Sequence, residues 1–145
     1  MSQDKGVVLN GRVLVPGHGE GQILVLVEPL SLWGGLEPES GEIIDRRHPQ
    51  SGQNVNGRVL VLPAGRGSSS ASSILLEAVR LGTAPSAIVT AEADPILALG
   101  AAVAREMYDK APPVVVLAGE DYGRLQNGYM ARVTPEGRVV LLQNP

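Results

Sequence analysis

The chain has 145 residues, of which 43% are hydrophobic and 19% charged, so it is long and apolar enough for one folded domain and is not disordered. A net charge of −3 and an aromatic content of 3% argue against a nucleic-acid-binding protein, and the absence of cysteine excludes disulfides and thiolate metal ligands within the chain. No apolar run approaches the roughly 20 residues that span a bilayer, and the start MSQDKG lacks a signal-peptide pattern, so we expect a soluble, cytoplasmic protein.

The first part of the chain is predicted to contain short strands and many turns. Residues 11–17 and 21–29 are typical of two strands with a glycine-rich turn between them. Gly34, Gly35 and Gly41 permit tight backbone turns, and a short strand is expected at 43–44. The polar stretch 46–57 is then expected to be a surface loop.

The middle of the chain alternates between buried strands and helices. The second helix begins with Asp94 as N-cap and Pro95 at the first helical position. Strand–helix–strand order favours a parallel sheet with right-handed crossovers. The expected elements are strands within 58–63, 87–90 and 112–119, helices over 71–81 and 94–107, and a late hairpin over 128–143 that turns at 134–137. Together they predict an α/β domain, a mixed sheet or half-barrel packed with helices.

The segment AGRGSSSA, residues 64–71, stands at a junction where a strand gives way to a helix. Ligands of open α/β sheets bind beyond the carboxyl ends of strands, where glycines and a helix N-terminus present backbone N–H groups. One serine would be enough to cap the helix, so capping alone remains an alternative, although the serine-rich run exceeds that need. The segment lacks the lysine of a P-loop, the third glycine of a dinucleotide fingerprint and a G-x-S-x-G elbow. Neither His18 nor His48 is next to the serines, and both are expected in surface loops.

Two longer stretches carry a family resemblance: PLSLWGGLEPESGEIID, and GRVLVLPAGRGSSSASSILLEAVRLGTAPSAIVTAEADPILALG. They resemble the small subunit of the aconitase X family, the swivelling domain of an aconitase-like dehydratase. The resemblance implies a single swivelling β/β/α domain over residues 1–145. It also implies a larger partner subunit that binds an iron–sulfur cluster, and an active site formed between the two chains. This chain, having no cysteine, would itself bind no metal.

The resemblance also implies roles for individual residues of the glycine–serine segment. Ser68 stands where aconitases have the serine base that removes a carbon-bound proton, and the helix N-terminus would stabilise its alkoxide. Arg66 would grip a substrate carboxylate or add positive charge. Aconitases acting on citrate have an arginine after their paired serines, whereas this chain has Ser70, so citrate is not carried over as substrate. The substrate-binding residues implied by position are Gly65, Arg66, Gly67, Ser69 and Ser70.

Several alternatives remain open at this point. The dehydratase could act on cis-3-hydroxy-L-proline, which we favour, or on mevalonate 5-phosphate, for whose phosphate Arg46, Arg47 and Arg66 are candidate partners. A non-catalytic anion-binding or scaffold domain is the alternative of another class, whereas a phosphohistidine carrier would need a histidine at the junction.

Four residues outside the glycine–serine segment are further candidates. Trp33 could sit in an interface loop or anchor the core. Asp45 could orient a site group or cap a turn. Glu92 and Asp94 share the sheet edge with the serine turn, and a helix cap is the safer role for Asp94.

Overall fold

The computed structural model describes residues 6–66 and 70–142, which form one large sheet, one small hairpin and three helices. The large sheet contains β1 (Val7–Asn10), β2 (Arg12–Val15), β3 (Gly19–Val25), β6 (Val59–Leu62), β7 (Ala87–Thr90), β8 (Val114–Val116), β9 (Met130–Val133) and β10 (Arg138–Leu141). The hairpin is β4 (Leu36–Glu37) with β5 (Glu42–Ile43), and the helices are α1 (Ser70–Leu81), α2 (Pro95–Tyr108) and α3 (Gly119–Gly123). None of these helices is long and apolar enough to cross a membrane.

The centre of the large sheet is parallel, as the strand–helix alternation predicts. Its order is β1-β10-β9-β3-β6-β7-β8-β2, with parallel pairing from β3 through β8 and antiparallel strands on either side. The predicted helices and the late hairpin are confirmed, and Gly34 and Gly41 have positive φ, as their predicted turns permit. The first two predicted strands are present as β2 and β3, but they do not pair with each other. Instead β2 pairs with β8, and β3 pairs with β6 and β9. Neither β1 nor α3 was predicted.

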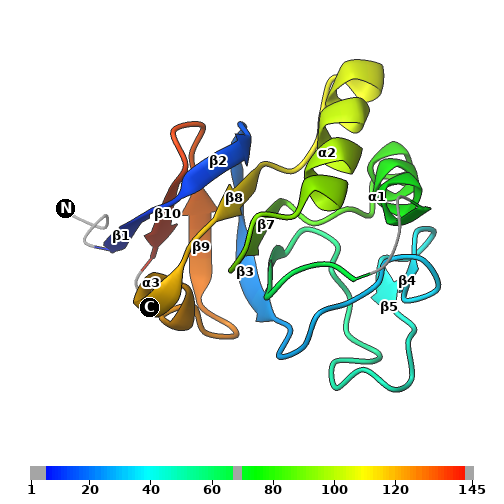
Figure 1. The fold of residues 1–145 in the computed structure, drawn as a ribbon, viewed down its shortest axis with the longest axis horizontal. Coiled ribbons are helices and arrows are strands. Elements are labelled where there is room, and N and C mark those ends of the chain that lie inside the picture. The colour runs from blue at the N-terminus through cyan, green and yellow to red at the C-terminus, as the bar shows by residue number, and fades with distance from the viewer. Residues whose placement is uncertain (1–5, 67–69, 143–145) are drawn as a thin grey trace.

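Gly11 joins the two edges of this sheet. It is the single residue between β1 and β2, which are the first and last strands of the order, so the sheet curls back on itself as a half-barrel (Figure 1). Its N–H donates to the Gly137 carbonyl at 2.9 Å, and a Cβ at Gly11 would lie 2.3 Å from Val115 Cγ1. The bend therefore requires glycine, and it passes the chain from β1, which pairs with β10, to β2, which pairs with β8.

The parallel strands are buried on both faces, which explains their continuous apolar sequences. In β6, Leu60 and Leu62 pack under α1 and α2, while Val59 and Val61 face the second core inside the curled antiparallel strands. Figure 1 shows the two long helices on one side of the parallel strands, and α3 with the antiparallel strands β1, β9 and β10 on the other side. The core is almost wholly aliphatic, as the low aromatic content predicts.

The Tyr122 hydroxyl on α3 is buried and lacks a hydrogen-bond partner among the described residues. Burial raises its pKa to about 12, whereas an exposed tyrosine titrates near pH 10. Between about pH 10 and 12 the unfolded chain therefore binds fewer protons than the folded chain, so the free energy of unfolding falls as pH rises. We expect Tyr122→Phe to lessen this fall and to keep or raise stability near neutral pH, because it removes an unpaired buried hydroxyl.

Urea unfolding at about pH 8 and about pH 11 measures this effect. Tyr129→Phe, which changes an exposed tyrosine, is the matched control. An identical loss of stability with pH in the wild type and in Tyr122→Phe would contradict the prediction.

Candidate functional site

The start of the glycine–serine segment, up to Arg66, lies at the carboxyl edge of the parallel sheet, as predicted from the strand–helix order. After β6, the Pro63 carbonyl accepts hydrogen bonds from Ala91 at 3.1 Å and Glu92 at 3.3 Å, the residues that follow β7. On the other side, Gly65 forms a parallel bridge with Leu30. Residues 63–65 are thus held between two neighbouring chain segments. Gly67, Ser68 and Ser69 lie outside the described residues, and their predicted roles stay predictions.

The backbone amides of Gly65 and Arg66 are used within the chain. Gly65 N–H donates to Asp94 Oδ2 at 2.5 Å, and Arg66 N–H donates to the Leu30 carbonyl at 3.2 Å. The expectation that this part of the segment leaves bare amides for a ligand is wrong for these two groups, because tertiary contacts occupy them. Any contact of Gly65 with a substrate would therefore not use this N–H, and its assignment to substrate binding stays a prediction.

Asp94 is the N-cap of α2, as predicted, and also the acceptor for Gly65. Its Oδ1 accepts from the Ile96 and Leu97 amides at 3.0 Å each, while Pro95 occupies the first helical position. The side chain is 7% exposed. One buried carboxylate thus connects the start of α2 to the start of the glycine–serine segment.

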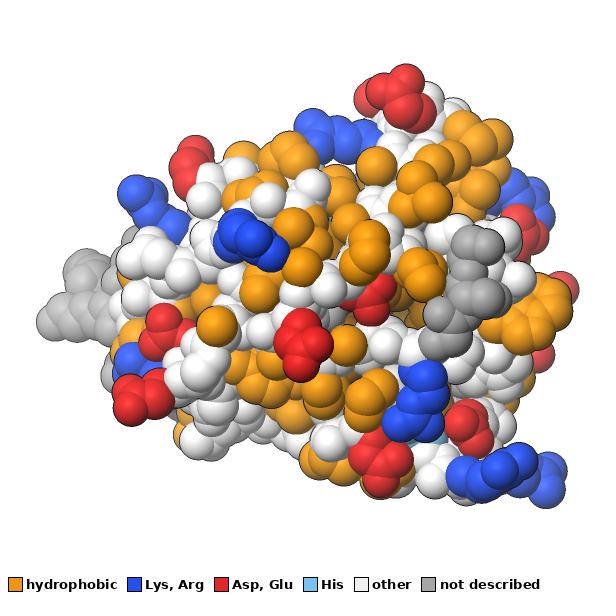
Figure 2. All heavy atoms as spheres, viewed as in Figure 1, with side chains coloured by type: hydrophobic (Ala, Val, Ile, Leu, Met, Phe, Trp, Pro, Cys, Tyr) orange, Lys and Arg blue, Asp and Glu red, His pale blue; other side chains and the backbone are white. Residues whose placement is uncertain are grey.

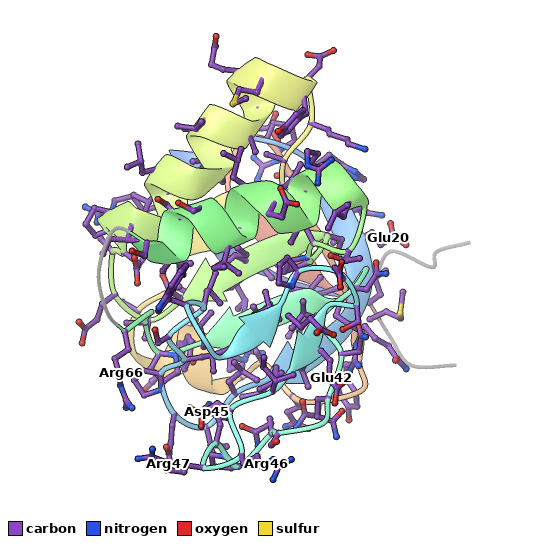
Figure 3. The ribbon with its side chains drawn as sticks, turned by 90° about the vertical axis from the view of Figure 1, so that its right-hand side faces the viewer. Glu20, Glu42, Asp45, Arg46, Arg47 and Arg66 are labelled. Carbon is purple, nitrogen blue, oxygen red and sulfur yellow. The ribbon has the colours of Figure 1, made fainter. Side chains whose placement is uncertain are left out.

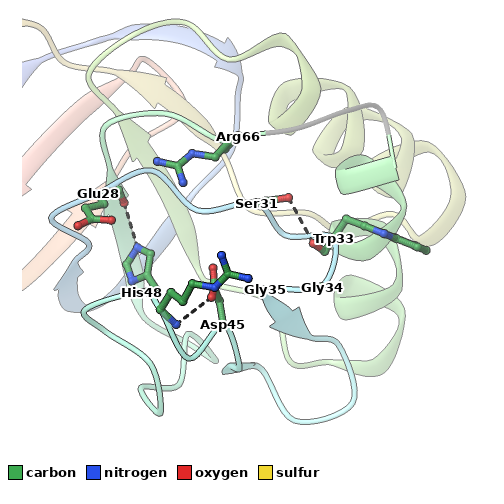
Figure 4. A pocket seen from close by; sticks show the side chains of 9 residues that line it. Glu28, Ser31, Trp33, Gly34, Gly35, Asp45, His48 and Arg66 are labelled. Atoms are coloured by element: carbon green, nitrogen blue, oxygen red, sulfur yellow. Dashed lines mark hydrogen bonds between the residues drawn. The ribbon is translucent and has the colours of Figure 1, made fainter.

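A hollow of about 380 Å³ opens beside Arg66, between the loops that precede β4 and follow β5 (Figure 4). Figure 3 places Arg66, Asp45 and Arg47 at the same end of the molecule, below α1. Figure 2 shows positive and negative side chains intermixed at this end of the molecule. The hollow is lined by Glu28, Ser31, Trp33, Gly34, Gly35, Asp45, Arg47, His48 and Arg66.

The lining of this hollow carries balanced charge. Arg47 and Arg66 contribute two guanidinium groups, and neither forms an ion pair with another described residue. Glu28 and Asp45 contribute two carboxylates. Asp45 also accepts from the Arg47 backbone N–H at 3.0 Å, so it caps its own turn as well as lining the hollow. Unpaired arginines of this kind are available to an anionic group of a ligand.

His48 is buried, so its prediction as a surface side chain is wrong, although it does lie in the predicted loop. Its Nε2 faces the Glu28 carbonyl at 3.1 Å, and Gln50 N–H donates to Nδ1 at 3.0 Å. These partners define a neutral ring with the proton on Nε2. Both nitrogens are used to join two loops, so His48 serves structure in this conformation. His18 is exposed at the other end of the sheet, as predicted.

Trp33 is 62% exposed, which rules out the core-anchor alternative. Figure 4 shows its ring pointing outward from the rim of the hollow. The turn beneath it needs glycine, because a Cβ at Gly35 would lie 2.1 Å from the Ser31 carbonyl oxygen, and Gly34 has φ +78°. The loop therefore presents the single tryptophan beside the charged hollow.

Comparison with known proteins decides the family. The model of the family described as "Aconitase X swivel domain" matches residues 8–142. The chain belongs to this family. The swivel domain also resembles a chain in the crystal structure of Thermococcus kodakaraensis aconitase X in its holo-form. The two share 35% sequence identity and a TM-score of 0.85, and the match covers 95% of this chain and all of that chain. The predicted swivelling fold is thereby confirmed.

Two groups of relatives match this swivel domain. A cis-3-hydroxy-L-proline dehydratase from Pseudomonas aeruginosa is 46% identical over 130 residues, 90% of this chain. A phosphomevalonate dehydratase small subunit from Methanosarcina acetivorans is 33% identical over 138 residues, 94% of this chain and 92% of that subunit. By contrast, the swivel domain spans about a fifth of the length of the two cis-3-hydroxy-L-proline dehydratases it matches.

A metal centre does not fit the described part of this swivel domain. Within residues 6–66 and 70–142, no three side chains of His, Asp or Glu lie together in a way that could hold a metal ion, and the sequence contains no cysteine.

Proposed function

We propose that residues 1–145 act as one swivelling domain of an aconitase X-type hydro-lyase that dehydrates cis-3-hydroxy-L-proline. The active site is completed by an aconitase X-type large subunit. The observation that carries the proposal is the position of Arg66, the last described residue at the start of the glycine–serine segment, at the carboxyl edge of the sheet and in the lining of the charged hollow, in a chain of this family. The expected cytoplasmic location belongs to the same proposal.

The reaction is an elimination of water from a hydroxy acid. A base removes a proton from carbon, the electron pair forms the carbon–carbon double bond, and the carbon–oxygen bond breaks as hydroxide leaves and is protonated to water. Ser68 is the base, two residues before α1 begins. The first turn of α1 contains no acidic residue, so the positive end of its dipole remains available to stabilise the serine alkoxide.

The large subunit binds the iron–sulfur cluster in this proposal, because the described residues of this chain offer no ligand set for it. When bound, the cluster supplies Lewis-acid assistance to the departing hydroxide. On this chain, Arg66 holds the substrate carboxylate through its guanidinium, which forms no ion pair with another described residue.

The charge of the hollow favours the hydroxyproline substrate. cis-3-Hydroxy-L-proline carries one carboxylate and one ammonium group, and the lining offers both arginines and carboxylates. Mevalonate 5-phosphate carries a carboxylate and a phosphate and no cation, so Glu28 and Asp45 would repel it. It remains the second candidate, because phosphomevalonate dehydratase small subunits match nearly their full length to this chain.

The experiment is a two-substrate assay of this chain purified together with its large subunit. We expect kcat/KM for cis-3-hydroxy-L-proline to exceed that for mevalonate 5-phosphate by about 100-fold or more. A reversed preference would assign the chain to the second candidate. Binding of the large subunit without dehydration of either compound would favour the scaffold alternative.

A further inference from the structure

Asp94 is the one buried carboxylate among the described residues. None of the lysines or arginines described forms an ion pair with it. Burying a carboxylate is costly unless hydrogen bonds satisfy it, and here three backbone amides do so. A serine or asparagine would cap α2 as well without a buried charge. The cap alone therefore does not explain why a carboxylate occupies this position.

The second oxygen of Asp94 supplies the explanation. Oδ1 accepts both amides of α2, and Oδ2 accepts only the Gly65 amide, at 2.5 Å. Gly65 lies three residues before Ser68 in the sequence. A hydrogen bond to an ionised acceptor is stronger than one between neutral groups. The contact thus connects the start of the glycine–serine segment to the capped N-terminus of α2.

The packing around Gly65 leaves no room for a side chain next to Asp94. A Cβ at Gly65 would lie 2.6 Å from Asp94 Oδ2, so any other residue would push the carboxylate away. Further hydrogen bonds, from Ala91 and Glu92 to the Pro63 carbonyl, fix the same segment from the side of β7. The Leu30 carbonyl, which accepts from Arg66, fixes it from the opposite side.

We infer that Asp94 is a positioning residue for the start of the glycine–serine segment: its Oδ2 holds Gly65, which precedes the proposed base, Ser68, by three residues in the sequence. This inference rests on the proposed function. Loss of the contact lowers kcat more than it raises KM, because a displaced base weakens the chemical step while the substrate is still held elsewhere.

The test is Asp94→Ser in the complex with the large subunit. Serine keeps a hydroxyl that can cap α2 but has no second oxygen for Gly65. We expect complex formation to persist and kcat for dehydration to fall by about 10- to 100-fold, with KM changed by less than about threefold. Hydrogen–deuterium exchange at the Gly65 amide is expected to become faster, a readout independent of activity.

A second variant tests the inference if Asp94→Ser does not fold. Gly65→Ala displaces the same carboxylate from the other side and is expected to reproduce the fall in kcat. Gly123→Ala is its matched control, since Gly123 has open space around a Cβ and no positive φ. Unchanged kcat in whichever variant folds, with faster exchange at the residue 65 amide, would overturn the inference. Full activity of Ser68→Ala in the same assay would instead overturn the proposed base.

Discussion

Replacement of Ser68 by alanine is expected to lower kcat of the assembled enzyme by about 10²- to 10⁴-fold, the usual contribution of a positioned base. The hydroxyl is the only group that the change removes, so binding of the large subunit and the helix content of α1 are expected to persist. Steady-state dehydration of cis-3-hydroxy-L-proline by the purified complex, with a binding measurement on the same sample, tests this result.

Ser73→Ala is the matched control for this experiment. Ser73 lies exposed on α1, one turn beyond its start, and belongs to the same serine-rich run. We expect kcat of Ser73→Ala to equal that of the wild type. Undiminished activity of Ser68→Ala would remove the base from this chain and leave a scaffold role for the swivel domain.

Arg66→Gln is expected to lower kcat/KM by about 10- to 100-fold, because a hydrogen bond from a charged group to a ligand contributes about 1.5–3 kcal/mol. The Arg66 guanidinium has no ion-pair partner among the described residues and lines the hollow, so it is available to the substrate carboxylate. Arg66→Lys is expected to recover only part of the loss, since lysine cannot bind a carboxylate through two parallel hydrogen bonds.

Arg46→Gln controls for the loss of one positive charge near the site. Arg46 is exposed, adjoins Arg47 in sequence and is absent from the lining of the hollow. We expect kcat/KM of this variant to stay within about twofold of the wild type. Equal losses in Arg46→Gln and Arg66→Gln would mean that overall charge, and not a contact from Arg66, supports substrate binding.

The parallel half of the fold could be predicted because its signals are local. The apolar run at β6, the cap at Asp94 and the stop at Gly82, which has φ +79°, each fix an element from adjacent residues. The pairing that curls the sheet could not be predicted, because β1 pairs with β10 from the other end of the chain. Closure at Gly11 depends on that pairing and on the approach of Val115.

The position of the candidate site followed from sequence, but its internal contacts did not. Strand–helix order alone places Arg66 at the carboxyl edge of the sheet. The use of the Gly65 amide by Asp94 joins residues 29 positions apart, and no periodicity signals it. His48 is similar, since the polar sequence around it is typical of a surface loop. It is buried where its two ring nitrogens form hydrogen bonds with the Glu28 carbonyl and the Gln50 amide.

The most direct measurement is a crystal structure of the two-chain complex with cis-3-hydroxy-L-proline or an unreactive analogue bound. We predict that Ser68 Oγ lies about 3–3.5 Å from the carbon that gives up its proton, with the Arg66 guanidinium against the carboxylate. A different basic group at that carbon, with Ser68 Oγ turned toward its own helix, would contradict it.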